Sequence, residues 1–177
     1  MNAILVTSNN SKLREFKRFG LDLSYEKGKD ISEVDGTIDD VIIYKALAAG
    51  KDKIVEDTIL EVDGEEIVDI RWKINQMDKE AEAKWIVSLG YNDGTNIKVY
   101  RGIIIGNLHK SDKKSEFGFD VYFTPHGSEV SLAILEEQGQ KDNFSARKIA
   151  CQALLKDEYI LKKSINSIPE WNGNYQH

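Results

Sequence analysis

The sequence is poor in residues that interrupt or cross-link a chain. Its 177 residues include two prolines, Pro125 and Pro169, and one cysteine, Cys151. A single cysteine excludes an intrachain disulfide framework and favours a reducing compartment, so we expect a cytoplasmic protein with a buried, unreactive thiol. The scarcity of proline leaves long uninterrupted segments in which helices and strands can form.

Long apolar segments and an excess of positive charge are also missing. No apolar run approaches the roughly 20 residues that span a bilayer, and Met1-Asn2-Ala3 does not resemble the start of a secretory signal, so no membrane association is expected. The 24 Lys and Arg residues face 30 Asp and Glu residues, which gives a net charge of −6. This balance argues against a nucleic-acid polymer as partner but allows a small anionic ligand, because a few local cations can bind one.

Hydrophobic patterning predicts alternating strands and helices, which indicates an α/β fold with a mixed sheet. Strands are expected over residues 3–7 and 119–124, with one or two over 95–108 and two short ones within 53–62. Helices are expected over 10–19, 38–50, 78–89 and 144–162. Asn9 or Asn10 is suited to begin the first helix, and Gly50 to end the second. We expect one domain over residues 1–165 and a flexible tail over 166–177.

The first candidate site follows the N-terminal strand. Thr7-Ser8-Asn9-Asn10-Ser11-Lys12 brings hydroxyls, amides and a cation to the start of a helix. Backbone N–H groups at a helix start, with a lysine nearby, suit a phosphate. The glycine spacing of a P-loop is absent, and a capped helix with a surface lysine is the alternative interpretation.

Acidic residues supply a second candidate site. Glu56-Asp57-Thr58 follows the apolar pair Ile54-Val55. Two adjacent carboxylates at a strand end can hold Mg²⁺ and activate a water, whereas a turn with solvated acids is the alternative. A further ligand could come from Glu33, Asp35, Asp39 or Asp40.

Two segments suit a planar ligand. In Phe117-Gly118-Phe119-Asp120, the glycine lets a ring stack on the ligand and the carboxylate can accept from ring N–H groups, although aromatic pairs are also common in cores. Near the last helix, Arg147 could donate to a keto oxygen, with Lys141 and Ser145 beside it as binding groups, or as a solvated charge and a helix cap. The three histidines, His109, His126 and His177, show no catalytic or metal-ligand spacing and are expected at the surface.

Taken together, the order of these segments resembles the inosine triphosphate pyrophosphatase family over about residues 4–155. The segment from Thr7 to Lys12 is similar to the family's Thr-Gly-Asn-x-x-Lys loop, and Val55-Glu56-Asp57-Thr58 to its acidic step. Phe117-Gly118-Phe119-Asp120 is similar to its base pocket, and Ser145-Ala146-Arg147 to its Ser-His-Arg segment. Single positions that also match are Glu33, Asp40, Lys45, Arg71 with Trp72, and Lys141.

The resemblance implies a fold and a reaction. The fold is a central mixed sheet with two lobes around an active-site cleft, usually in a homodimer. The reaction is hydrolysis of non-canonical purine nucleoside triphosphates, such as ITP, dITP or XTP, to the monophosphate and pyrophosphate, with Mg²⁺ as cofactor and Mn²⁺ as a substitute. The implied metal ligands are Glu33, Asp40, Glu56 and Asp57, and the implied catalytic residues are Asp57, Lys12 and Glu56. The implied substrate contacts are Thr7, Ser8, Asn9, Asn10, Lys12, Lys45, Thr58, Arg71, Phe117, Gly118, Phe119, Asp120, Lys141, Ser145 and Arg147.

Three departures from the family pattern keep alternatives open. Ser8 replaces a glycine, Val121 a proline, and Ala146 the histidine before Arg147. The residues implied for phosphate and metal binding therefore match the family pattern better than the residues implied for base binding. One alternative is a pyrophosphatase with altered base specificity, and another is a nucleotide-binding or regulatory protein on an inactive scaffold. The retained acidic step and lysines favour an enzyme, because a pure binding protein has no need of the acidic step.

Overall fold

The computed structural model describes residues 1–28, 31–113 and 118–176. Its elements are β1 (Ile4–Val6), α1 (Asn10–Arg18), β2 (Ser24–Glu26), α2 (Ile38–Ala49), β3 (Lys53–Val62), β4 (Glu65–Glu66), α3 (Ile70–Gln76), β5 (Ala81–Asn92), β6 (Asn96–Leu108), β7 (Phe123–Pro125), α4 (Leu132–Glu137), η1 (Lys141–Phe144), α5 (Ala146–Leu155), β8 (Leu161–Ser164) and η2 (Ile165–Ser167). Helices and strands alternate along the chain, which confirms the predicted α/β class. Among these residues no helix is long and apolar enough to cross a membrane.

Within the described residues, eight strands form one mixed sheet. The main path has the order β2-β1-β3-β5-β6-β7, and β4 pairs with β3 while β8 pairs with β6. Strand β1 is parallel to both neighbours, with Ile4 opposite Ser24 on one side and Lys53 on the other. Strand β6 is antiparallel to β7 and β8. The sheet is therefore mixed, as predicted.

The chain divides into two compact units. Unit 1 comprises Met1–Asp57, Val87–Gly102 and the residues from Arg147 onward, and unit 2 comprises Thr58–Ile86 and Ile103–Ala146. The boundaries fall inside β3, β5 and β6, so each of these strands contributes residues to both units.

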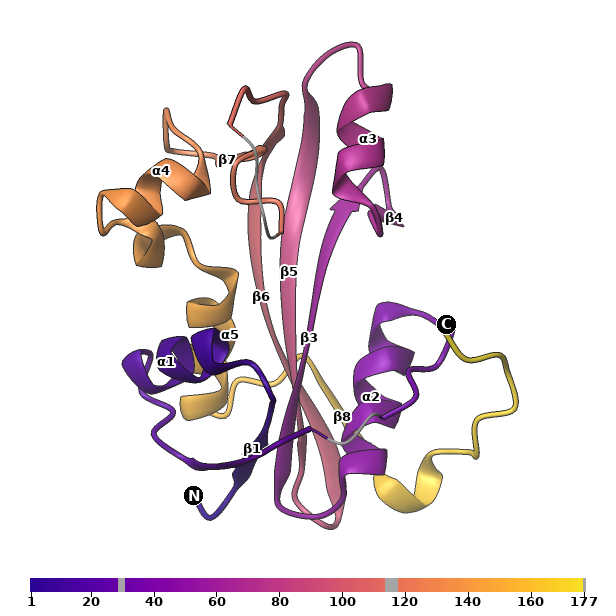
Figure 1. Cartoon of the computed structure of the whole chain (residues 1–177). Helices are drawn as coiled ribbons and strands as arrows, with labels where there is room; N and C mark the ends of the chain where they lie inside the picture. Colours follow the sequence, from indigo (N-terminus) through magenta and orange to yellow (C-terminus); the bar gives the residue numbers. More distant parts are fainter. Residues whose placement is uncertain (29–30, 114–117, 177) are drawn as a thin grey trace. The chain divides into compact units, whose positions relative to one another are not determined.

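Helices cover both faces of the strands in unit 1. Figure 1 shows α1 and α5 on one side of these strands and α2 on the other. Gly90 on β5 lets α2 lie close, because a Cβ there would stand 3.1 Å from the Ile42 carbonyl oxygen. The core cluster under α2 consists of Ile42, Ile43, Ala46, Val55, Ile97 and Val99. This packing fixes the position of α2, which carries Lys45.

Unit 2 holds a close pairing of β6 and β7. Gly106 lies opposite Pro125 in the antiparallel register. A Cβ at Gly106 would stand 2.4 Å from the carbonyl oxygen of Thr124, so only glycine permits this approach. Phe119 packs edge-on against Trp85 and Phe123, with ring centroids 5.9 and 5.7 Å away. These contacts give unit 2 an aromatic core.

Strand β5 replaces the helix predicted over residues 78–89. Residues 85–90 are all buried, and β5 lies between β3 and β6 in the sheet. A strand that is covered on both faces loses the polar–apolar alternation of a half-exposed strand. Its apolar residues Trp85, Ile86 and Leu89 then match a helical spacing by coincidence, which explains the wrong prediction.

Other element predictions need smaller corrections. Residues 53–62 form one strand rather than two, and the strand predicted over 119–124 is confined to β7. The last helix ends at Leu155, because Asp157 has the left-handed φ of 55° and the chain then turns into β8. The expected caps are confirmed: Asn9 begins α1, and Gly50, with φ 95°, ends α2.

Two further expectations concern Cys151 and the C-terminal tail. Cys151 is fully buried, and burial raises the pKa of its thiol to about 12, which agrees with the predicted inert thiol. The tail contacts other parts of unit 1, because Trp171 packs edge-on against Tyr44 and Tyr175 forms a β-bridge with Val34. The polar composition of the tail conceals these two aromatic contacts.

Candidate active site

The loop after β1 opens into a pocket of about 280 Å³ that lies wholly within unit 1. Several predicted phosphate-binding and acidic residues share its lining, namely Thr7, Ser8, Asn9, Lys12, Glu33, Lys45 and Glu56. Asn10 is the first residue of α1, and the described lining does not include it. Residues that are up to 49 positions apart in the sequence therefore meet at one small polar cavity.

Asn9 shapes the phosphate loop by capping α1. Its Oδ1 accepts hydrogen bonds from the backbone N–H groups of Ser11 (2.9 Å) and Lys12 (3.2 Å). Its own backbone N–H donates to Thr7 Oγ1 at 3.2 Å. The cap and the anion site are thus compatible interpretations, because the capped loop presents Lys12 at the positive end of a helix.

Lys45 reaches the pocket from α2. Its Nζ lies 3.1 Å from Glu33 Oε1 and donates to the backbone carbonyl of Glu56 at 2.8 Å. The side chain is 21% exposed, so the ammonium is largely shielded but still accessible from the pocket. A second cation therefore stands in the same cavity as Lys12.

Glu56 is the buried centre of an ion-pair network. Its carboxylate is 4% exposed and accepts two hydrogen bonds of 3.0 Å from Arg147, one from Nε and one from Nη2. Lys12 Nζ lies 3.1 Å from the same carboxylate. A further Arg147 contact is Nη1 donating to Glu15. Charge-assisted hydrogen bonds of this kind hold the Glu56 carboxylate in one orientation.

The position of Arg147 differs from the sequence interpretation. Arg147 was expected to contact a base, but the guanidinium donates to Glu56 and Glu15 in unit 1. Burial works against its charge, but the charges and hydrogen bonds of these two carboxylates hold the pKa of Arg147 above its ordinary value. Glu15 was missed. The signal that could have found it is its spacing of three residues from Lys12, which puts both on one face of α1.

Asp57 faces a different electrostatic environment from its neighbour. Successive side chains of a strand point to opposite faces, and the described lining of the unit 1 pocket includes Glu56 but not Asp57, although the Asp57 carboxyl interacts electrostatically with Lys45. Burial raises the pKa of the Asp57 carboxyl above its usual value, and the positive charge of Lys45 opposes that rise. The negative charges of Glu33 and then Glu56 raise it further. Asp57 is therefore a shielded carboxylate in a crowded acidic environment.

These donors suit one divalent ion that also binds phosphate. Among the described residues, no group of three or more His, Cys, Asp or Glu side chains is arranged to hold a metal. Mg²⁺, however, is commonly bound through one or two carboxylates together with substrate phosphates. Asp57 and Glu33 are the candidates for that mode, because a cation would relieve the repulsion from Glu33 that, after burial, raises the pKa of Asp57. Glu56 fits less well, because Arg147 occupies both of its oxygens.

Asp40, also predicted as a metal ligand, serves α2 instead. Its Oδ2 accepts from the backbone N–H and the hydroxyl of Thr37, at 3.0 and 2.9 Å, and completes a capping box. The described lining of the phosphate pocket does not include Asp40. A carboxylate that caps its own helix has little freedom to move toward a metal.

Apart from Arg147, the predicted base-binding residues that the structure describes lie in unit 2. Asp120 accepts from Lys141 Nζ at 2.6 Å, and Lys141 stands 6.0 Å from the centre of the Trp85 ring. Gly118 has the left-handed φ of 69° that favours glycine. Phe119 packs on Trp85, a residue that the sequence analysis did not single out. Phe117 lies outside the described residues.

Three other predicted substrate contacts are Thr58, Arg71 and Ser145. Thr58 continues β3 after Asp57, and Arg71 is exposed near the start of α3. Ser145 is buried next to Ala146, which is fully buried and offers no polar group.

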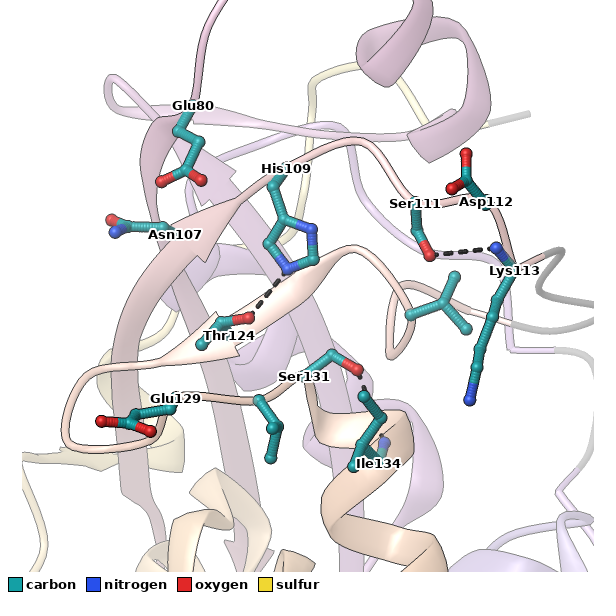
Figure 2. Close-up of a pocket in the computed structure, with 12 residues that line it drawn as sticks. Glu80, Asn107, His109, Ser111, Asp112, Lys113, Thr124, Glu129, Ser131 and Ile134 are labelled. Carbon is teal, nitrogen blue, oxygen red and sulfur yellow. Dashed lines mark hydrogen bonds between the residues drawn. The ribbon is translucent and has the colours of Figure 1, made fainter.

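A second pocket, of about 600 Å³, surrounds His109 in unit 2 (Figure 2). His109 Nδ1 lies 2.9 Å from the Lys110 carbonyl oxygen, which can only accept, so Nδ1 donates there. Nε2 of the neutral ring then accepts from the Thr124 hydroxyl at 2.8 Å. The ring is therefore fixed and half-buried rather than simply at the surface, whereas His126 is exposed as expected and His177 lies outside the described residues.

The fold and the unit 1 pocket define an α/β protein in which a capped loop, two lysines and two carboxylates line one cavity. Comparison with known proteins identifies the family. The Ham1 family model matches residues 3–67 and 65–157, and the chain belongs to this family. The predicted family resemblance is thereby confirmed.

Named relatives and solved structures agree with this assignment. The inosine triphosphate pyrophosphatase of Candida albicans (strain WO-1) is 30% identical over 138 residues, covering 67% of this chain and 68% of the relative. The inosine triphosphate pyrophosphatase of Yarrowia lipolytica is 28% identical over 178 residues, covering 87% and 94%. The structure of the Staphylococcus aureus Ham1 protein has a TM-score of 0.68 at 24% identity, covering 88% of this chain and 99% of that one, and shows the same fold.

Proposed function

We propose that this chain is a nucleoside triphosphate pyrophosphatase that hydrolyses non-canonical purine nucleotides, such as ITP, dITP or XTP, to the monophosphate and pyrophosphate. The observation that carries the proposal is the unit 1 pocket, where a capped loop, Lys12, Lys45 and two carboxylates converge. The names of the relatives support the reaction class. A homodimer and a cytoplasmic location stay predictions from the sequence.

The lysines are suited to the triphosphate. Lys12 and Lys45 are paired with Glu56 and Glu33, at 3.1 Å in both cases. Each pair keeps an ammonium at the pocket in a defined position, and phosphate oxygens would add to or replace the carboxylate contacts. A departing pyrophosphate gains negative charge in the transition state, so two fixed cations stabilise that state more than the bound substrate.

Asp57 is suited to orient the attacking water and take up its proton. A raised pKa makes its carboxylate a stronger base than that of an ordinary aspartate. Glu56 cannot substitute, because its oxygens accept from Arg147 and Lys12. Glu56 instead positions Lys12.

Asp57 and Glu33 are the side chains that would hold Mg²⁺, or Mn²⁺ in its place, together with phosphate oxygens of the substrate. The ion supplies charge neutralisation at the phosphates and polarises the bond that breaks. Every other role in the pocket belongs to the side chains already described.

Base preference is a separate part of the proposal. The Lys141–Asp120 pair and the ring of Phe119 offer polar and stacking contacts in unit 2. Ala146 lacks a polar group where the family pattern has a histidine. A pocket that has lost one polar contact discriminates less strongly between bases. An altered base specificity is therefore the second candidate, whereas a purely regulatory protein would leave Asp57 and its acidic neighbours unexplained.

The proposal is tested by the rate of ITP consumption with MgCl₂ and with EDTA. We expect the rate to fall by about a hundredfold or more in EDTA, because metal-ion catalysis supplies several kcal/mol of charge stabilisation. The same assay with XTP, dITP, GTP and ATP ranks the bases. Equal rates in both buffers would contradict the proposed metal requirement. Nucleotide binding without any hydrolysis would contradict the proposed enzymatic activity.

A further inference from the structure

Residues 169–176, here termed the C-terminal strap, pair with the segment that carries Glu33. The backbone N–H of Gln176 donates to the Glu33 carbonyl at 2.8 Å, and the N–H of Asp35 donates to the Asn174 carbonyl at 2.8 Å. Between them, Val34 forms an antiparallel bridge with Tyr175. The side-chain amide of Gln176 adds a hydrogen bond of 3.0 Å to the Val34 carbonyl. The strap thus holds residues 33–35 from both sides of Val34.

Trp171 anchors the strap at its other end. Its ring meets Tyr44 of α2 edge-on, with centroids 5.2 Å apart, and its Nε1 donates to the Asn174 carbonyl at 2.8 Å. Two glycines make room for the ring. A Cβ at Gly36 would lie 2.9 Å from Trp171 Cη2, and a Cβ at Gly173 would lie 2.7 Å from its Cζ2. No larger residue fits at either position while the indole is seated.

The strap spans open space between these contacts. A pocket of about 600 Å³ lies between it and α2, with Leu47, Ile168 and Tyr175 in its lining. The Tyr44 hydroxyl donates to the Pro169 carbonyl at 2.7 Å at one edge of this pocket. The strap is therefore not packed solidly on α2, and its hold on residues 33–35 depends on Trp171 and the bridge.

Residues 33–35 lead directly to the phosphate pocket. The Glu33 side chain pairs with Lys45 at 3.1 Å, and both line that pocket. All residues in this chain of contacts belong to unit 1. The strap also lies beyond residue 157, where the match to the family model ends.

We propose that the C-terminal strap is a positioning element for the phosphate site, acting through Glu33 on the ammonium of Lys45. This inference rests on the proposed phosphate-binding role of the pocket. When the strap is seated, Glu33 has one backbone position and holds Lys45 toward the pocket. When it is unseated, Lys45 loses that orientation and must be ordered by the ligand, which weakens phosphate binding.

The test is a double-mutant cycle between Trp171→Ala and Glu33→Gln, read as the Kd for inorganic tripolyphosphate in Mg²⁺ buffer by calorimetry. We expect Trp171→Ala to weaken binding about tenfold when Glu33 is present, the effect of one lost charge-assisted contact. In the Glu33→Gln background the same change should weaken binding less than about twofold, because the intermediary is already gone. Gly173→Ala, which crowds the indole from the other side, should follow Trp171→Ala in both backgrounds.

The control is Asn172→Ala, an exposed strap residue, which should leave the Kd unchanged. A merely structural role would lower the melting temperature equally in both backgrounds and would weaken binding by the same factor in each. Such additivity would overturn the inference. A wild-type protein that binds no tripolyphosphate would overturn it together with the phosphate pocket. Binding without hydrolysis of any nucleotide would overturn the proposed function alone.

Discussion

Replacing Asp57 by asparagine is expected to lower kcat/KM for ITP by about 10²–10⁴-fold, the usual contribution of a general base. The change keeps the shape of the side chain and removes the group that we assign to the attacking water. Steady-state kinetics in Mg²⁺ buffer measures the loss.

The same substitution is expected not to destabilise the fold. Burial and the charges of Glu33 and Glu56 raise the pKa of Asp57 in the folded state. A raised carboxyl pKa means that the ionised form is less favourable when folded than when unfolded, so ionisation costs stability above the unfolded pKa. The neutral amide of Asp57→Asn removes that cost, and the melting temperature should stay level or rise. We read this as strain stored at a functional position.

Glu61→Gln is the matched control, because Glu61 lies on the same strand and is only partly buried. It should change kcat/KM by less than about twofold, as expected for a site away from buried networks. An Asp57→Asn variant that keeps kcat/KM within tenfold of the wild type would remove Asp57 from the mechanism.

Replacing Arg147 by methionine is expected to lower the free energy of unfolding by about 3–5 kcal/mol, the cost of removing one partner from a buried ion pair. Methionine retains apolar bulk near Phe16, whose ring centre lies 5.9 Å from the guanidinium carbon. The loss of unfolding free energy therefore measures the broken contacts with Glu56 and Glu15 rather than the formation of a cavity. Urea denaturation measures it.

Neutralising the two carboxylates that contact Arg147 should recover part of that loss. The triple variant Glu15→Gln, Glu56→Gln, Arg147→Met should be more stable than Arg147→Met alone, because its buried groups are neutral. Arg14→Met, at an exposed position on α1, is the control and should lie within about 0.5 kcal/mol of the wild type. If the single and triple variants were equally stable, the ion pairs of Arg147 with Glu56 and Glu15 would not account for the lower free energy of unfolding.

Local signals in the sequence predicted the elements that place the phosphate loop. Asn9 caps α1 and Gly50 ends α2 because side-chain and backbone preferences act within a few residues, which a single sequence displays. Strand β5 was missed because burial on both faces removed its alternation. The polar composition of the tail gave no sign of the contacts that Trp171 and Tyr175 make.

Long-range charge pairing was not predictable from the sequence in the same way. Arg147 lies 91 residues from Glu56 and 132 residues from Glu15, and nothing local to it distinguishes a base contact from a structural ion pair. Asp40 likewise matches an acidic position of the family pattern. Its reciprocal hydrogen bonds with Thr37, three positions earlier, make it part of a helix capping box. The family pattern supplied the candidate residues, whereas the structure shows which of them contact one another.

Phosphorus NMR of ITP during incubation with the protein and Mg²⁺ tests the central claim most directly, because it identifies the phosphoanhydride bond that is cut. The account predicts that the triphosphate signals are replaced by those of the monophosphate and pyrophosphate, and that Asp57→Asn nearly abolishes the change. Release of orthophosphate with formation of the diphosphate, or triphosphate signals that persist under conditions where the nucleotide binds, would contradict it.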